Sequence, residues 1–116
     1  MIEHRQQPRI LVHWKVVIAA GGHVFEGHAV DVSTEGMTLL SPNRMDEKQH
    51  CKVQFSIPGL EKGTARLVQI DAVVVNVVLA AHLYEFRVGV HFLDLAGADR
   101  AALEIFLKNH FPVLGS

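Results

Sequence analysis

Hydrophobic and polar residues alternate along most of this chain, and a period of two is typical of β-strands with one buried face. In the first run the apolar positions are Ile10, Val12, Trp14, Val16 and Ile18. Gly21-Gly22 then marks a tight turn, as in a β-hairpin. The same pattern predicts further strands at 24–33, 37–41, 53–57, 64–79 and 84–92.

The run from Thr64 to Leu79 is long for a strand, and its alternation is blurred between residues 72 and 79. This predicts either a β-bulge or a strand that is covered on both faces. If one face of residues 72–81 is exposed, this apolar strand is also a candidate surface for a homodimer. Burial in the core is the simpler interpretation.

One helix is predicted near the end of the chain, over about residues 98–111. Its apolar residues recur at three- and four-residue spacing, which gives a single core-facing stripe: Leu103, Phe106, Leu107 and Phe111. Asp99 is the predicted N-cap, and Pro112 ends the helix.

Five to seven short antiparallel strands followed by one helix predict an all-β fold with one C-terminal α-helix, in the form of a small barrel. Closure of the sheet is the usual way to hide strand edges. With 116 residues, 49% of them hydrophobic, the chain has room for one core. We assign residues 10–112 to this barrel domain and residues 1–9 to a flexible, polar N-terminal arm.

Charge and composition exclude several classes of protein. The 11 Lys and Arg residues against 12 Asp and Glu give a net charge of −1, without the basic excess of proteins that coat DNA. The single cysteine, Cys51, excludes a disulfide scaffold. The apolar stretch at 72–81 is too short for a membrane span, and no His or Cys pair has zinc spacing. We therefore expect a cytoplasmic protein with no metal, no cofactor, and no DNA or membrane partner.

Two polar motifs remain as candidates for function. Arg5 and Arg9 form an RxxxR spacing just before the first strand, and Asp31, Ser33 and Gly36 form a DxSxxG spacing at the end of the second. Each motif is weak when taken alone. A solvated arm readily carries two arginines, and Asp, Ser and Gly are common turn residues, the glycine because it tolerates a positive φ.

Together the two motifs predict a site for a guanine nucleotide that carries phosphate. Asp31 and Ser33 are two residues apart in a strand, so their side chains share one face. Gly27 and Ala29 precede them on that face and would leave it shallow and open. An arginine binds phosphate in a bidentate manner and reads the O6 and N7 acceptors of guanine. A carboxylate accepts hydrogen bonds from donors such as the N1–H and N2–H₂ groups of guanine.

The order of these features resembles a PilZ domain over about residues 5–107. The resemblance rests on RxxxR, a strand pair, DxSxxG, hydrophobic strands, the RVGVHFL sequence at 87–93 and the C-terminal helix. It implies a six-stranded antiparallel PilZ-type β-barrel and a bacterial receptor for the second messenger cyclic di-GMP, with a role in motility or biofilm signalling.

The resemblance also implies a role for each motif residue. Arg5 and Arg9 would wrap over the ligand and grip its phosphates and guanine Hoogsteen edges. Asp31 and Ser33 would hold a guanine base, while Gly36 would shape the backbone of the turn.

His4 stands where many members of the family have a further arginine. The residue at this place bears on whether one ligand molecule or a stacked pair is bound, so the stoichiometry stays open. His4 is a possible accessory residue that would stack on the ligand or donate to a phosphate.

Two alternatives to the receptor stay open. One is a PilZ-type adaptor that binds only protein. The other is an OB-like barrel for single-stranded nucleic acid, which would need a basic groove with exposed aromatic residues. Catalysis is not expected, because Ser33 lacks a G-x-S-x-G elbow and Asp31 projects beside it rather than behind a histidine. A one-domain receptor would act through a separate effector protein.

Overall fold

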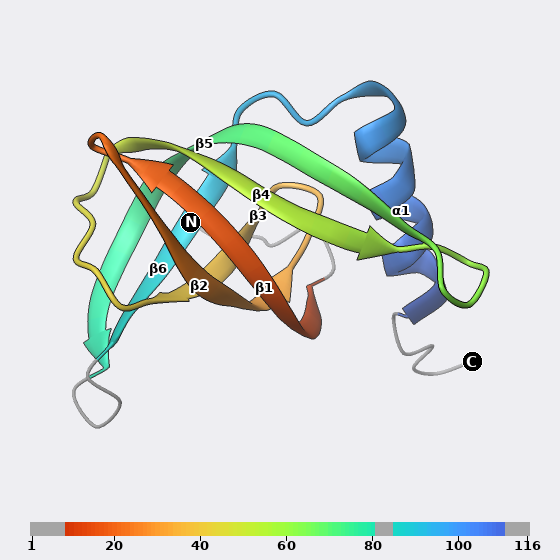
Figure 1. Cartoon of the computed structure of the whole chain (residues 1–116), viewed down its shortest axis with the longest axis horizontal. Helices are drawn as coiled ribbons and strands as arrows, with labels where there is room; N and C mark the ends of the chain where they lie inside the picture. Colours follow the sequence, from red (N-terminus) through yellow and green to blue (C-terminus); the bar gives the residue numbers. More distant parts are fainter. Residues whose placement is uncertain (1–8, 81–84, 111–116) are drawn as a thin grey trace, which may run out of the picture.

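The computed structural model describes residues 9–80 and 85–110, which form a closed antiparallel β-barrel with one helix (Figure 1). Its elements are β1 (Ile10–Ala20), β2 (His23–Val32), β3 (Gly36–Ser41), β4 (His50–Pro58), β5 (Ala65–Ala80), β6 (Glu85–Phe92) and α1 (Gly97–His110). The strands close in the order β1-β2-β3-β6-β5-β4. The predicted six-stranded barrel with one C-terminal helix is therefore confirmed.

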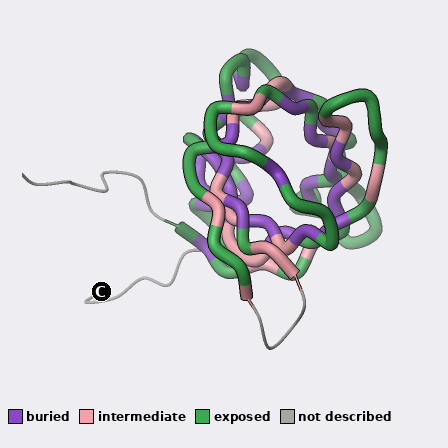
Figure 2. Tube along the Cα trace, turned by 90° about the vertical axis from the view of Figure 1, so that its left-hand side faces the viewer, coloured by how far each residue is buried: buried purple, intermediate pink, exposed green. Residues whose placement is uncertain are grey.

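The inward-facing side chains of the strands fill one core. Figure 2 shows the strands as a ring, with buried positions recurring around it. On β4 the alternation is regular, and the buried residues are Cys51, Val53, Phe55 and Ile57. The Phe55 ring stacks against Trp14 on one side and Phe92 on the other, with ring centroids 5.7 and 6.1 Å away.

The turn between β1 and β2 is made by the two glycines predicted for it. Gly21 and Gly22 have φ of 61° and 82°, a conformation that residues with a Cβ rarely adopt. Ala20 and His23 close the hairpin on either side. The turn therefore fixes the register of β1 with β2 as far as the Trp14–Ala29 pair. Beyond it the register shifts by one residue, and Leu11 pairs with Asp31.

The blurred alternation on β5 comes from a β-bulge. The register with β6 shifts between Val74 and Asn76, so the bulge expected there is confirmed. The alternative, a strand covered on both faces, is wrong. Val75, Val78 and Leu79 are more than half exposed, while Val74 is buried.

A further bulge, between β2 and β3, corrects the expected surface around the DxSxxG motif. The register between β2 and β3 shifts between Ala29 and Asp31. Ala29 is consequently buried in the core, whereas Asp31 faces outward. Gly27 is also buried, with the carbonyl oxygen of Leu40 only 2.6 Å from the place of a Cβ. The expectation that Gly27 and Ala29 form an open face with Asp31 is wrong, because a bulge reverses the alternation.

Helix α1 packs against the barrel through Leu103, Phe106 and Leu107, as its apolar spacing predicts. The fourth predicted position, Phe111, lies outside the described residues. Phe106 contacts Trp14 at the barrel end, with ring centroids 5.1 Å apart. Asp99 is not the N-cap, because the helix already begins at Gly97, and it instead accepts a hydrogen bond from Arg66 at 2.8 Å. Among the described residues, no helix is long and apolar enough to cross a membrane.

Burial on β4 gives a pH-dependent contribution to stability. Desolvation and, second, the Asp71 charge raise the pKa of the Cys51 thiol from 9.0 to about 11. The unfolded chain therefore loses this proton between pH 9 and 11 while the folded protein keeps it. Stability present below pH 9 is lost as the pH rises, by up to about 2–3 kcal/mol.

We expect the free energy of unfolding of Cys51→Ala to fall less steeply between pH 8.5 and 10.5 than that of the parent protein. Chemical denaturation across this range measures both slopes. Lys52, whose pKa is raised by its hydrogen bond to Asp71, is present in both proteins, so its contribution cancels in the difference. Parallel pH profiles would contradict the burial argument.

Candidate functional site

Arg9 and Asp31, one residue from each motif, are in direct contact. Nη1 of Arg9 donates a hydrogen bond to Oδ1 of Asp31 at the point where β1 begins and β2 ends. Their side chains are 34% and 20% exposed, so the pair lies at the surface of the barrel. The structure thus brings together Arg9, the second arginine of RxxxR, and Asp31, the acid of DxSxxG.

This ion pair leaves most of the hydrogen-bonding capacity of both groups unused. A guanidinium has five N–H donors and a carboxylate has about four lone-pair positions. A partly exposed pair contributes only about 0–1 kcal/mol, so a ligand can share or replace it at little cost. Arg9 and Asp31 together offer a donor set and an acceptor set on one small surface.

Leu11 is a neighbour of this pair that sequence reasoning missed. It is the strand partner of Asp31 on β1, and it is 86% exposed. The signal was present in the sequence, since Leu11 interrupts the alternation between Ile10 and Val12. An exposed aliphatic side chain beside a polar pair suits the flat face of a ring system.

Ser33 shapes the turn that follows β2. Its hydroxyl oxygen accepts a hydrogen bond from the Glu35 N–H at 3.1 Å, and its own N–H donates to the Gly36 carbonyl at 2.9 Å. Ser33 is only 2% exposed. The Glu35 carbonyl in turn accepts the Phe92 N–H at 2.8 Å, which ties this turn to the end of β6. Ser33 therefore holds the backbone beside Asp31 in place.

Gly36 is required for a different reason from the one expected. It has no positive φ; instead, a Cβ at this position would overlap the carbonyl oxygen of Val90 and lie 3.1 Å from the carbonyl carbon. The close approach of β3 to β6 at the Gly36–His91 pair allows no side chain. Gly36 therefore fixes the backbone where β3 begins, and its part in a ligand site stays a prediction.

The remaining candidates, His4 and Arg5, lie outside the described residues. Within the described ranges there is no cluster of three or more His, Cys, Asp or Glu side chains that would hold a metal ion.

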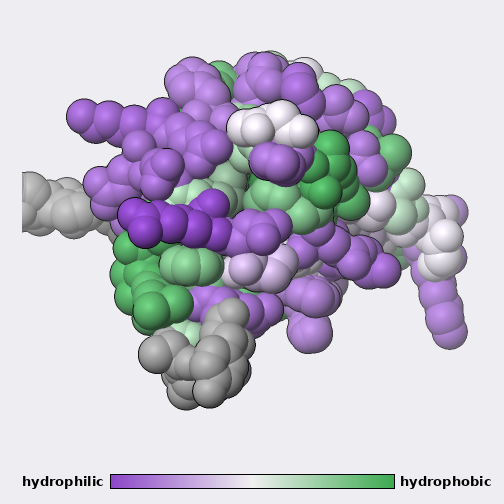
Figure 3. All heavy atoms as spheres, turned by 60° about the vertical axis from the view of Figure 1, so that its left-hand side comes forward, coloured by the Kyte–Doolittle hydropathy of each residue, from purple (hydrophilic) through white to green (hydrophobic). Residues whose placement is uncertain are grey.

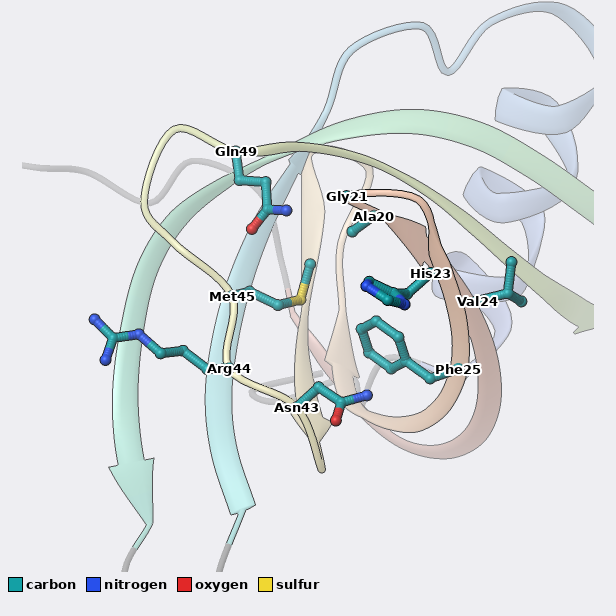
Figure 4. A pocket seen from close by; sticks show the side chains of 9 residues that line it. All are labelled: Ala20, Gly21, His23, Val24, Phe25, Asn43, Arg44, Met45 and Gln49. Atoms are coloured by element: carbon teal, nitrogen blue, oxygen red, sulfur yellow. The ribbon is translucent and has the colours of Figure 1, made fainter.

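A cavity of about 480 Å³ lies at the opposite end of the β1–β2 ribbon, away from the motif residues. Figure 4 shows the rings of His23 and Phe25 and the amides of Asn43 and Gln49 projecting toward its centre. The guanidinium of Arg44 points away from them, and its Nε lies 3.4 Å from Asp46. A cavity without an inward cation is poorly suited to a phosphate ligand, so the Arg9–Asp31 surface is the better candidate site.

Comparison with solved structures gives the same fold. The inhibitor of motility MotI/DgrA from Bacillus subtilis matches with a TM-score of 0.78 and 16% identity, over 93% of this chain and 52% of that one. The PilZ domain of YcgR from Escherichia coli matches with a TM-score of 0.68 and 14% identity, over 93% of this chain and 92% of that one. MrkH from K. pneumonia matches with a TM-score of 0.71 and 16% identity, over 93% and 52%.

The chain thus spans about half the length of MotI/DgrA and MrkH, and nearly all of the YcgR domain. A comparison with curated proteins found no match. The family model for the PilZ domain matches residues 3–109, which include both motifs and all six strands. The chain therefore belongs to the PilZ domain family.

Proposed function

We propose that this protein binds cyclic di-GMP at the Arg9–Asp31 surface and relays the signal to a partner protein. The observation that carries the proposal is the contact between Arg9 and Asp31, which brings one residue of each motif together. A guanine presents acceptors at O6 and N7 and donors at N1 and N2, so one base can engage both side chains. Each phosphate adds an anion for the free N–H groups of Arg9.

The other motif residues would act around this pair. Arg5 would close over the ligand from the N-terminal side, with His4 as an accessory contact. Ser33 and Gly36 would keep the turn beside Asp31 in shape. Leu11 would pack against the plane of the base.

The similar solved structures support this choice of ligand. The YcgR domain and MrkH are solved with c-di-GMP, and MotI/DgrA is an inhibitor of motility. By analogy, ligand binding would draw the segment that carries Arg5 onto the Asp31 surface and so create a surface for the partner. Ordering costs about 1–2 kcal/mol for each fixed backbone residue, which several charge-assisted hydrogen bonds of about 1.5–3 kcal/mol would offset. In this proposal the protein acts in the cytoplasm, without a cofactor and without catalysis.

Selectivity between cyclic dinucleotides tests the proposed recognition. Adenine carries a donor where guanine has O6, and it lacks the N2 amino group that Asp31 would accept from. Titration calorimetry of the protein with cyclic di-GMP and with cyclic di-AMP should therefore show binding of the guanine ligand only. Equal affinities would mean that Asp31 does not read the base, and the calorimetric stoichiometry would give one or two ligands per chain.

Two alternatives fit the observations less well. A protein-only adaptor has no need for a pre-formed Arg9–Asp31 pair. An OB-like nucleic-acid binder would expose aromatic rings for stacking, whereas the large exposed hydrophobic side chains of the described residues are all aliphatic.

The proposed homodimer would use the exposed part of β5 only. Figure 3 shows a hydrophobic area over the end of this strand, where Val75, Val78 and Leu79 are 53%, 57% and 58% exposed. Ala72 and Val74 of the same apolar run are buried in the core. A dimer through residues 75–79 would cover these three side chains.

We expect Val78→Glu to convert any dimer to monomer without loss of fold, because Val78 faces solvent in the monomer. Sedimentation velocity of parent and variant, with circular dichroism as the control for folding, measures this. A parent protein that sediments as a strict monomer at high concentration would contradict the dimer.

A further inference from the structure

The cavity of about 480 Å³ at the end of the barrel away from Arg9 and Asp31 has no part in the proposed function. Its volume lies within the range of about 300–1,000 Å³ that is usual for small-molecule sites, and the mouths of β-barrels are a recurrent place for such sites. We call the five residues that build its walls the barrel mouth: His23, Phe25, Asn43, Met45 and Gln49.

Two rings from β2 form one wall of the barrel mouth. The inward-facing row of this strand contains Gly27 and Ala29, which are buried. Phe25 and His23 continue the row toward the beginning of the strand, because alternate residues share a face. Figure 4 shows both rings turned toward the cavity, where Phe25 is half-buried and His23 is exposed. The row that fills the core thus ends in two accessible rings.

The opposite wall is the connection 42–49 between β3 and β4, and hydrogen bonds to β5 hold it in place. The Lys48 N–H donates to the Val74 carbonyl at 2.8 Å, and the Val74 N–H donates to the Gln49 carbonyl at 2.9 Å. Lys48 has a φ of 72°, which a residue with a Cβ keeps only when its surroundings impose it. Met45, from the same wall, is buried and closes the core beneath the cavity. The cavity is therefore built by fixed backbone on both sides.

The polar groups of the barrel mouth are amides. The hydrogen bonds of Asn43 to other described residues use its backbone, so its side-chain amide is available. Oε1 of Gln49 accepts the Asp46 N–H at 3.0 Å, which orients this amide and leaves the N–H groups on Nε2 to donate. Among the described residues that line the cavity, none turns a guanidinium, ammonium or carboxylate toward its centre, because Arg44 points outward.

We propose that the barrel mouth binds a small, uncharged, planar ring compound that carries both a hydrogen-bond donor and an acceptor. The ring would lie against His23 and Phe25, since aromatic side chains favour stacked or edge-to-face contact with another ring. Its acceptor would face Nε2 of Gln49, and its donor would face the Asn43 carbonyl oxygen. An anion of the same shape would lose its hydration without gaining a fixed cation, so the site selects the neutral compound.

Three probes of similar size test this chemistry: benzamide, benzoate and toluene. In ¹⁵N NMR titrations at pH 8, benzamide should shift the amide signals of Gly21 and Gln49 with a Kd below about 10 mM, while the signal of Asp31 stays in place. Benzoate replaces the amide by a charge, and toluene lacks the polar group. Both should bind at least about fivefold more weakly than benzamide. Equal binding of benzoate or toluene, or no binding of benzamide, would overturn the proposal.

Two histidines of β2 supply matched variants. His28 is exposed like His23, but it lies on the outer face of the strand, with its ring 5.7 Å from that of His13. We expect His23→Ala to raise the Kd for benzamide at least about fivefold and His28→Ala to change it less than about twofold, because only His23 can stack on the ring. Equal effects of the two variants would overturn the proposal.

Asn43→Ala tests the hydrogen bond separately. The Asn43 side chain is exposed and its amide is free, so the variant should keep the circular dichroism spectrum of the parent. Its affinity for benzamide should fall to about that for toluene. Benzamide affinity equal to that of the parent would show that the Asn43 amide does not contact the ring compound, and it would overturn the proposed recognition.

Discussion

Replacing Arg9 with alanine should weaken the binding of cyclic di-GMP at least about 100-fold, which places it beyond detection in a standard titration. Arg9 already contacts Asp31 in the structure. It would supply at least two charge-assisted hydrogen bonds to the ligand. Each such bond contributes about 1.5–3 kcal/mol, and a tenfold change in affinity corresponds to about 1.4 kcal/mol. Isothermal titration calorimetry measures the change.

The fold should not depend on Arg9, because a partly exposed ion pair stabilises a protein by about 0–1 kcal/mol. Arg100→Ala is a matched control, since it removes another surface arginine–carboxylate contact, that of Arg100 with Glu104 at 3.2 Å on α1. It should bind the ligand like the parent. Unchanged binding by Arg9→Ala would remove Arg9 from the site, and loss of its β-sheet circular dichroism would show a structural role instead.

Gly36→Ala should destabilise the barrel by about 3 kcal/mol or more. Its new methyl group would overlap the backbone carbonyl of Val90, so β3 and β6 would have to separate at this point. Overpacking of a well-packed site costs about 1–3 kcal/mol, and a clash with backbone cannot be relieved by rotating a side chain. Urea denaturation followed by circular dichroism measures the loss.

Gly89→Ala is the natural comparison, because it places a methyl group on the same two strands, two pairs further along. There the nearest atoms belong to the movable amide of Asn76, at 3.0 Å. We expect its free energy of unfolding to fall by less than half as much as that of Gly36→Ala. An equal loss in both variants would mean that the barrel tolerates neither and that backbone contact is not the decisive difference.

The alternation of apolar residues was sufficient to predict most of the barrel. It predicted the strands, the β5 bulge and the buried stripe of α1, because each of these depends on the residues of a single element. It failed at Ala29, which lies in the core although it is two residues before the outward-facing Asp31. The bulge between them leaves no trace in a sequence where the intervening residue, Val30, is also apolar.

The site could be predicted only in part, because its contacts join elements that are distant in the sequence. The two motifs pointed to Arg9 and Asp31, but not to their direct contact, which depends on where β1 begins relative to the end of β2. Gly36 was expected for its φ and is needed for a contact with β6, a strand that lies about fifty residues further along the chain. Pairing between strands that are distant in sequence, such as β3 with β6, cannot be read from one sequence.

Calorimetric titration of the parent protein with cyclic di-GMP tests the central claim most directly. The account predicts saturable heat, with a stoichiometry of one or two, from a surface where Arg9 already lies on Asp31. No heat at high micromolar ligand, from protein with an intact β-sheet spectrum, would contradict the receptor and favour a PilZ-type adaptor that binds only protein.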